Sequence, residues 1–188
     1  MKHKKPHILI ASYGGGHSKS LLPVIKKLVE HHGVSVTVFG FTTAKKMFEN
    51  VCDTVLGYSD LPNEDTKEWN DFISPFFPSP SHPSIEFKDT RAYFSVCIQE
   101  LISQHGEQAA LELLEEKGRS CFLPISTFER FLKEHKVDLV VTSSSPRSEL
   151  ALQMAAVNLD ISSISVTDLF LQHESKYICD DAYAKVLT

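Results

Sequence analysis

The feature that most constrains the fold is an apolar segment that runs into three consecutive glycines. Residues 8–11 are apolar, and Gly14, Gly15 and Gly16 follow them. An amphipathic segment comes next. We expect Pro23 in the first turn of its helix, where the missing N–H of proline costs little. Apolar residues of that segment recur at three- and four-residue spacing, which places them on one face of a helix. These residues are Leu21, Leu22, Ile25, Leu28 and Val29. The stretch therefore predicts a strand, a tight turn and a helix.

The glycine turn is suited to binding an anion. Glycine adopts positive φ at little cost, so three in succession allow several backbone N–H groups to approach a ligand closely. The N-terminus of the following helix adds roughly half a positive charge. We therefore predict that Gly14, Gly15, Gly16 and Ser18 contact a phosphate or a similar anion.

Two common nucleotide-binding motifs do not fit this turn. The dinucleotide fingerprint requires a glycine where Lys19 stands and an acidic residue after the second strand, where residues 39–41 are Phe-Gly-Phe. The phosphate loop of nucleoside triphosphatases requires Gly-Lys-Ser/Thr, whereas residues 18–20 are Ser-Lys-Ser. NAD binding and ATP hydrolysis are therefore not expected, and no cofactor is predicted.

Length and charge narrow the class of protein. A chain of 188 residues can bury one sizeable core, so we interpret residues 1–188 as a single domain. The net charge of −5 argues against a nucleic-acid partner. The apolar run at 8–11 is too short for a secretion signal or a membrane span. We expect a cytoplasmic protein, and no residue pattern supports peripheral contact with a membrane.

The cysteines give no sign of a metal site. Cys52, Cys97, Cys121 and Cys179 are scattered in apolar surroundings and lack the paired spacing of zinc ligands. We interpret them as reduced and buried, in keeping with a cytoplasmic protein. No metal is predicted.

Strands and helices alternate along most of the chain. Runs of β-branched and apolar residues predict further strands at 34–39, 51–56, 137–141, 161–166 and 177–179. Helical spacing predicts helices at 42–50, 89–117 with a break near Gly106, 122–135, 149–158 and from 180 onward. Ser126 and Glu129 are spaced as a capping box for the helix at 122–135. This alternation predicts an α/β fold, a Rossmann-like parallel sheet with helices on both faces.

The pattern breaks at about residues 58–88. Five prolines in this segment prevent regular structure through much of it, while aromatic residues in its middle distinguish it from a solvated linker. These aromatic residues include Trp69, Phe72, Phe76 and Phe77. A long loop of this kind either packs over the core or forms the wall of a ligand site, and both interpretations stay open.

A second polar turn follows the predicted strand at 137–141. Ser143, Ser144 and Ser145 lie between this strand and the next helix, a position that suits an anion as the glycine turn does. Arg147 adds a charge that can hold a carboxylate or phosphate with two hydrogen bonds. The alternative is that the serines cap the helix and Arg147 pairs with a surface acid.

Two titratable residues are candidates for catalysis at this edge of the sheet. His17 follows the glycines, and a histidine titrates near neutral pH and can accept a proton in a transition state. Asp168 follows the strand at 161–166, where it can reach the same cleft and orient His17 or a substrate hydroxyl. The alternatives are that His17 caps its helix or hydrogen-bonds the turn, and that Asp168 caps a turn.

The sequence Gly14-Gly15-Gly16-His17 resembles the first loop of GT-B glycosyltransferases, where a Gly-Gly-His or Gly-x-Gly-His turn ends the first strand of the acceptor-side domain. It is most similar to the lipid-acceptor branch, the MurG-like and diacylglycerol glycosyltransferases. The resemblance implies that the chain forms one half of a GT-B fold. It also implies that His17 is the general base for the acceptor hydroxyl or holds the leaving diphosphate, and that the serine turn at 143–145 lines the cleft.

The resemblance implies nucleotide-sugar and acceptor substrates, but the sequence contains nothing similar to a GT-B donor domain. In these enzymes a strand and a helix like those at 177–187 lead to that domain. We therefore expect an acceptor-side half that is a truncated chain, a stand-alone domain or one subunit of a split enzyme. A separate donor-domain subunit or a homo-oligomer would then complete the site.

Two other functions remain open. A sugar-nucleotide 2-epimerase has the same two-domain plan, although its first strand usually runs into a Thr-Arg-Pro-Glu turn, where residues 13–16 here are Tyr-Gly-Gly-Gly. A non-enzymatic phosphate- or nucleotide-binding module would bind its ligand without turnover. The sequence favours the glycosyltransferase half over both.

Overall fold

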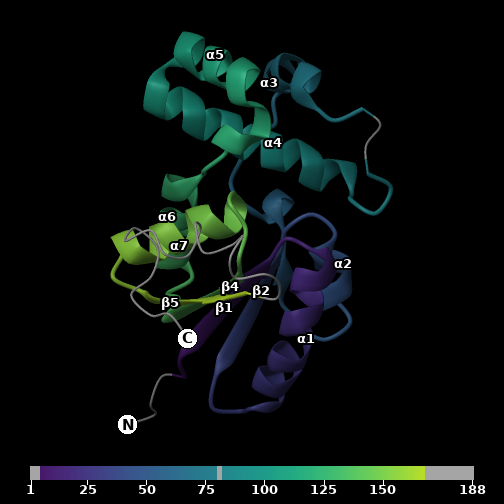
Figure 1. The fold of residues 1–188 in the computed structure, drawn as a ribbon, viewed down its shortest axis with the longest axis vertical. Coiled ribbons are helices and arrows are strands. Elements are labelled where there is room, and N and C mark those ends of the chain that lie inside the picture. Colours follow the sequence, from purple (N-terminus) through teal and green to yellow (C-terminus); the bar gives the residue numbers. More distant parts are fainter. Residues whose placement is uncertain (1–4, 80–81, 168–188) are drawn as a thin grey trace.

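The computed structural model describes residues 5–79 and 82–167 and has a parallel β-sheet at its centre (Figure 1). Within these residues the sheet has five strands in the order β3-β2-β1-β4-β5, and each neighbouring pair is parallel. The strands are β1 (His7–Ser12), β2 (Ser35–Gly40), β3 (Val55–Leu56), β4 (Leu139–Ser143) and β5 (Ser162–Val166). The predicted α/β fold class is confirmed.

The central strand β1 is buried on both faces. Leu9 and Ala11 point into one apolar cluster, and Ile8 and Ile10 point into another. This alternation follows from the two-residue period of a strand, and burial on both faces explains why β1 is a nearly continuous apolar run. Ile10 pairs with Val38 of β2 and Val141 of β4, so the glycine turn and the serine turn leave the sheet at the same edge.

Helices cover both faces of the sheet. On the face of Ile8 and Ile10, α1 (Gly15–Glu30) and α2 (Ala44–Phe48) bury Leu21, Ile25 and Phe48. On the other face, α6 (Ile125–Glu134) and α7 (Ser148–Asn158) pack against β1 and β4. Figure 1 shows the two helix pairs on opposite sides of the strands.

Helix α1 begins earlier than the sequence predicts. It starts at Gly15, so Pro23 lies in its interior instead of its first turn. The chain turns sharply at Gly14 and Gly15, which have φ of 146° and 62°, and only two of the three glycines therefore use positive φ. Gly16 already lies in the first turn of the helix, where a backbone N–H has no helical partner.

A helical layer lies beyond the carboxyl edge of the sheet (Figure 1). It consists of α3 (Lys67–Ile73), α4 (Phe87–His105) and α5 (Glu107–Lys117), with short 3₁₀ segments η1 (Tyr58–Asp60), η2 (Ser74–Phe76) and η3 (Gly118–Cys121). The predicted break near Gly106 separates α4 from α5. The 58–88 segment thus contains one seven-residue helix, and Trp69 of that helix donates a 2.8 Å hydrogen bond to Ser95 Oγ on α4.

The predicted capping box of α6 is wrong. The helix begins at Ile125 after Pro124, and no side chain next to it in sequence caps it. Instead, the buried Glu100 carboxylate of α4 accepts hydrogen bonds from the backbone N–H of Ser126 at 2.9 Å and from that of Thr127 at 3.3 Å. An acid 26 positions away in sequence therefore replaces the local cap, which a sequence pattern cannot show.

Several sequence predictions lie outside the described residues: Asp168, Cys179, the strand at 177–179 and the helix that follows it. Within the described residues Cys52, Cys97 and Cys121 are free thiols, and the first two are buried. None of the described helices is both long and apolar enough to cross a membrane.

Candidate functional site

The glycine turn after β1 is held tightly against the start of α2. A Cβ on Gly14 would overlap the Thr43 hydroxyl, so only glycine fits there, whereas Gly15 has open space around it. The Thr42 hydroxyl donates a 2.6 Å hydrogen bond to the backbone carbonyl of Tyr13, which fixes the residue before the turn. The N-terminus of α1 thus has a defined position at the carboxyl edge of the sheet.

Two of the predicted anion-binding serines meet inside the protein. Ser12 Oγ lies 3.2 Å from Ser18 Oγ and 3.0 Å from Ser143 Oγ, both within hydrogen-bond distance. All three residues are buried. Their hydroxyls therefore join β1, the first turn of α1 and the end of β4, and point into the interior.

Glu149 completes this buried network. Its carboxylate accepts a 3.2 Å hydrogen bond from Ser143 Oγ, and the side chain is 1% exposed. Burial raises the pKa of Glu149 to about 7, and hydrogen bonds from its own backbone N–H and from the Ser145 and Ser143 side chains oppose that increase. Glu149 is not predicted as a site residue from the sequence, because a glutamate at a helix start is usually solvated.

The other predicted site residues lie in different surroundings. Ser144 is buried, and the half-buried Ser145 supports Glu149. His17 is half-buried in the first turn of α1. Arg147 follows the serine turn, and its guanidinium carbon lies 5.5 Å from the centre of the Tyr13 ring. The side chain of Arg147, the N-cap residue of α7, makes no cap hydrogen bond, and Arg147 has no ion pair with a described acid.

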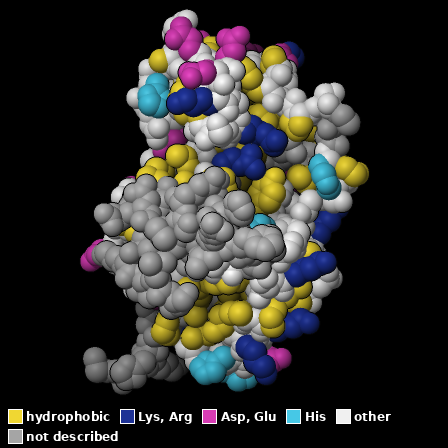
Figure 2. All heavy atoms as spheres, in the orientation of Figure 1, with side chains coloured by type: hydrophobic (Ala, Val, Ile, Leu, Met, Phe, Trp, Pro, Cys, Tyr) yellow, Lys and Arg dark blue, Asp and Glu magenta, His cyan; other side chains and the backbone are white. Residues whose placement is uncertain are grey.

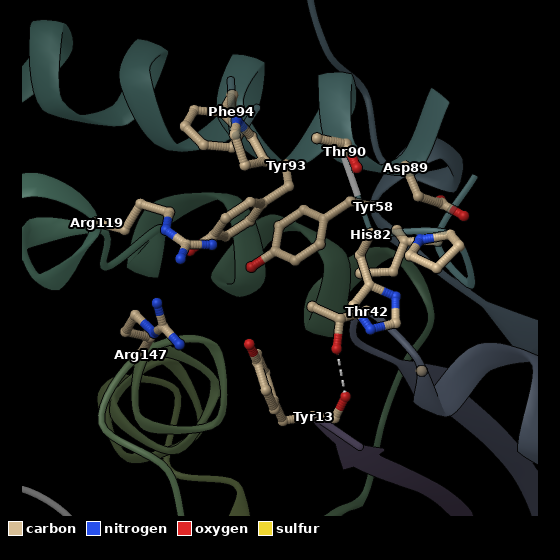
Figure 3. Close-up of a pocket in the computed structure, with 14 residues that line it drawn as sticks. Tyr13, Thr42, Tyr58, His82, Asp89, Thr90, Tyr93, Phe94, Arg119 and Arg147 are labelled. Atoms are coloured by element: carbon tan, nitrogen blue, oxygen red, sulfur yellow. Dashed lines mark hydrogen bonds between the residues drawn. The ribbon is translucent and has the colours of Figure 1, made fainter. Parts of the chain in front are cut away.

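A cavity of about 420 Å³ opens between the carboxyl edge of the sheet and α4 (Figure 3). The sheet loops contribute Tyr13 after β1, Thr42 after β2 and Arg147 after β4. The helical layer contributes residues of α4 and η3, and the 58–88 segment contributes the stretch around His82. On the face shown in Figure 2, basic side chains lie beside hydrophobic ones where the helical layer meets the sheet half.

The aromatic wall of the cavity is rigid. The Tyr58 hydroxyl is hydrogen-bonded to Ser148 Oγ at 2.8 Å, and the Tyr58 side chain is buried. Tyr93 packs edge-on against Tyr58, with 4.9 Å between ring centres, and against Phe122, with 5.4 Å. Such interlocked rings hold the shape of a pocket before a ligand arrives.

Two arginines provide the positive charge of the cavity. Arg119 and Arg147 both line it, and Figure 3 shows their guanidinium groups pointing toward one another beside Tyr93. Burial raises the pKa of Tyr93 above its usual range, and the charges of Arg147 and Arg119 act on it in the opposite direction. Both guanidinium groups therefore act on the same phenol.

The acid that lines the cavity, Asp89, already has partners. Its Oδ2 lies 3.4 Å from Lys45 Nζ, and its Oδ1 accepts a 3.1 Å hydrogen bond from the backbone N–H of Ser59. Among residues 5–79 and 82–167, no cluster of His, Cys, Asp and Glu is arranged to hold a metal ion. The chemistry of this cavity is therefore that of aromatic rings and two guanidinium groups.

Sequence reasoning found only part of this cavity. Arg147 was predicted as a site residue, and the 58–88 segment was predicted either to pack over the core or to form the wall of a ligand site. Four residues in the second half of that segment line the cavity. They are Pro78, His82, Pro83 and Ile85. Tyr13, Tyr93 and Arg119 were not predicted, because each comes from a different element and only the fold brings them together.

No protein-family model and no curated protein sequence matches the chain. Among solved structures, it is similar to the UDP-GlcNAc 2-epimerase of Methanocaldococcus jannaschii, with 18% identity and a TM-score of 0.42 over 85% of this chain and 31% of that one. It is also similar to the UDP-GlcNAc 2-epimerase of Neisseria meningitidis, with 12% identity and a TM-score of 0.43 over 89% of this chain and 34% of that one. A third similar structure is the Streptomyces sp. SF2575 glycosyltransferase SsfS6, with 14% identity and a TM-score of 0.45 over 87% of this chain and 39% of that one. The chain thus spans about a third of each of these proteins. At identities this low, the similarity concerns only the arrangement of strands and helices.

Proposed function

We propose that this chain is the acceptor-side half of a glycosyltransferase, which moves a sugar from a nucleotide-sugar to a hydroxyl of an acceptor. The observation that carries the proposal is the cavity beyond the carboxyl ends of β1, β2 and β4. Parallel sheets bind ligands at that edge, where the strand order reverses, and here the reversal falls between β1 and β4. Tyr13, which precedes the GT-B-like turn, lines the cavity.

The predicted catalytic residues and the two turns have these roles in the proposal. The acceptor occupies the cavity and extends its hydroxyl to His17, which is not among the lining residues and takes the proton as that oxygen attacks the sugar and the nucleoside diphosphate leaves. The backbone of Gly14–Gly16 and the N-terminus of α1 face the diphosphate. Asp168 orients His17, and the buried serines at 18 and 143 fix the two loops.

The nucleotide-sugar is bound mainly by a donor domain, which lies elsewhere in the same polypeptide, on a separate subunit or on a second copy. The turn resembles that of the MurG-like branch, and we propose a cytoplasmic reaction in keeping with that resemblance.

The test is sugar transfer by the native protein, purified with any subunit that accompanies it. Radiolabelled nucleotide-sugars are supplied together with hydroxylated aromatic and lipid acceptors, and labelled product is measured. We expect transfer, and His17→Ala should reduce kcat by about 100-fold or more, because a general base contributes at least that factor. The matched control is His32→Ala, since His32 is exposed just beyond the other end of α1.

Other outcomes would identify the alternatives. Conversion of the nucleotide-sugar to its 2-epimer without an acceptor would indicate an epimerase half. Tight nucleotide binding without turnover would indicate a binding module. Full transfer activity in His17→Ala, with an unchanged circular dichroism spectrum, would refute the catalytic role of His17.

A further inference from the structure

The guanidinium groups of the two arginines that line the cavity point toward one another (Figure 3). A guanidinium group stays charged at any physiological pH, so two of them that line one cavity repel each other. Within the described residues no carboxylate forms an ion pair with Arg119 or Arg147, and Asp89 is already bonded to Lys45 and Ser59. An anion placed between the guanidinium groups would turn this repulsion into attraction.

The rest of the cavity favours a flat apolar body. Tyr13, Tyr58, Tyr93 and Phe94 line it together with prolines of the 58–88 segment. The face of an aromatic ligand can pack against such rings, and the tyrosines that are held by hydrogen bonds and ring contacts need not reorganise to receive it.

The size and polarity of the cavity limit the ligand further. A volume of about 420 Å³ holds a fused two-ring molecule with its substituents, whereas an extended lipid chain exceeds it. Figure 3 shows Thr90, His82 and Asp89, which is paired with Lys45, on the side away from the two arginines, so the guanidinium groups lie at one end of the cavity. A ligand with one charged end would therefore bind in one orientation.

We infer that the cavity binds a planar aromatic molecule with one anionic substituent, a carboxylate or a phosphate, held jointly by Arg119 and Arg147. This inference rests on the proposed function in one respect, since it names the class of acceptor that a hydroxyl-bearing ligand of this kind would represent. Arg147 acts from the loop after β4 and Arg119 from η3, so the anion also links the sheet half to the helical layer.

The test is direct binding to the whole chain, without any sugar donor, measured by isothermal titration calorimetry. The probes are 6-hydroxy-2-naphthoate, its neutral counterpart 6-hydroxy-2-naphthamide, and 2-naphthyl phosphate. We expect one of the two anions to bind at least about 10-fold more tightly than the amide, because a bond between charged groups is worth that factor. The tighter anion identifies the substituent as a carboxylate or a phosphate.

Charge-removing variants locate the anion. Arg119→Met and Arg147→Met should each weaken binding of the anion by about 10- to 100-fold and leave the weak binding of the amide unchanged. The matched control is Arg130→Met, because Arg130 is exposed on α6 away from the cavity, and it should change neither. Arg119 is also exposed, so its variant stays interpretable if Arg147→Met, which loses the contact with Tyr13, folds poorly.

Three results would overturn the inference: equal affinity for the amide and the anions, anion binding that ignores both arginine variants, or no binding of any probe. Its failure is distinguishable from failure of the proposed function. Anion binding through the arginines without sugar transfer supports the inference and contradicts the glycosyltransferase. Sugar transfer to neutral acceptors, at rates that Arg119→Met leaves unchanged, supports the glycosyltransferase and contradicts the inference.

Discussion

Replacement of Glu149 by glutamine should make the protein more stable in mild alkali and remove a pH dependence. Burial raises the pKa of this carboxyl from its usual 4.5 to about 7 in the folded protein. Between these values the folded state holds a proton that the unfolded state has lost, so the free energy of unfolding falls as pH rises through this range. At about 1.4 kcal/mol per pKa unit, the loss reaches about 3 kcal/mol by pH 8.

The glutamine variant separates this charge effect from the hydrogen bonds. Glutamine keeps the shape of the side chain and one acceptor oxygen, but its amide nitrogen cannot accept, which costs about 1 kcal/mol. The difference in unfolding free energy between the variant and the wild type should therefore be near zero at pH 5 and about 2 kcal/mol in favour of the variant at pH 8.

Urea unfolding followed by circular dichroism between pH 5 and pH 8 measures this difference. The two proteins differ only at residue 149, so the contributions of groups far from it cancel in the comparison. Glu115→Gln is the matched control, because Glu115 is exposed on α5 and its replacement should give no pH-dependent difference. A constant difference between wild type and Glu149→Gln across the range would refute the reasoning, since it would mean that burial does not shift this pKa.

Two further substitutions test how the loops and the helical layer are held. Gly14→Ala should destabilise the protein by about 2 kcal/mol or more, and Gly15→Ala by about 1 kcal/mol, because both need positive φ but only Gly14 has no room for a Cβ. Equal losses in urea unfolding would contradict this. Glu100→Ala should cost about 2 kcal/mol by uncapping α6, and thermal melting that matches Glu115→Ala would show that the cap contributes little.

The sheet could be predicted because its signals are local. Each strand has a β-branched or apolar run whose period is visible in a few residues, and helices separate the strands at the spacing of parallel connections. The break near Gly106 was also predictable, since φ there is 79°, which favours glycine. Such features depend on neighbours in the sequence and not on the final fold.

The candidate site could be predicted only in part, because its geometry depends on distant residues. The serine turn looked like an anion site, yet Ser143 bonds to Ser12, which is 131 residues away, and faces inward. The position of Arg147 over Tyr13 depends on β1 pairing with β4. A motif gives the residue types of a loop, but not the direction in which each side chain points.

The buried network and the cavity depend on the same two loops. Ser12 belongs to the network and the next residue, Tyr13, lines the cavity; Arg147 lines the cavity and Glu149, two positions later, belongs to the network. The buried carboxyl is unfavourable for stability, since a group with a raised pKa loses folding free energy at neutral pH. Groups that destabilise a fold concentrate where a ligand or a reaction needs them. The buried carboxyl and the cavity therefore favour the β1–β4 edge as the candidate site, and they are separate from the resemblance in Gly14–Gly16 and His17.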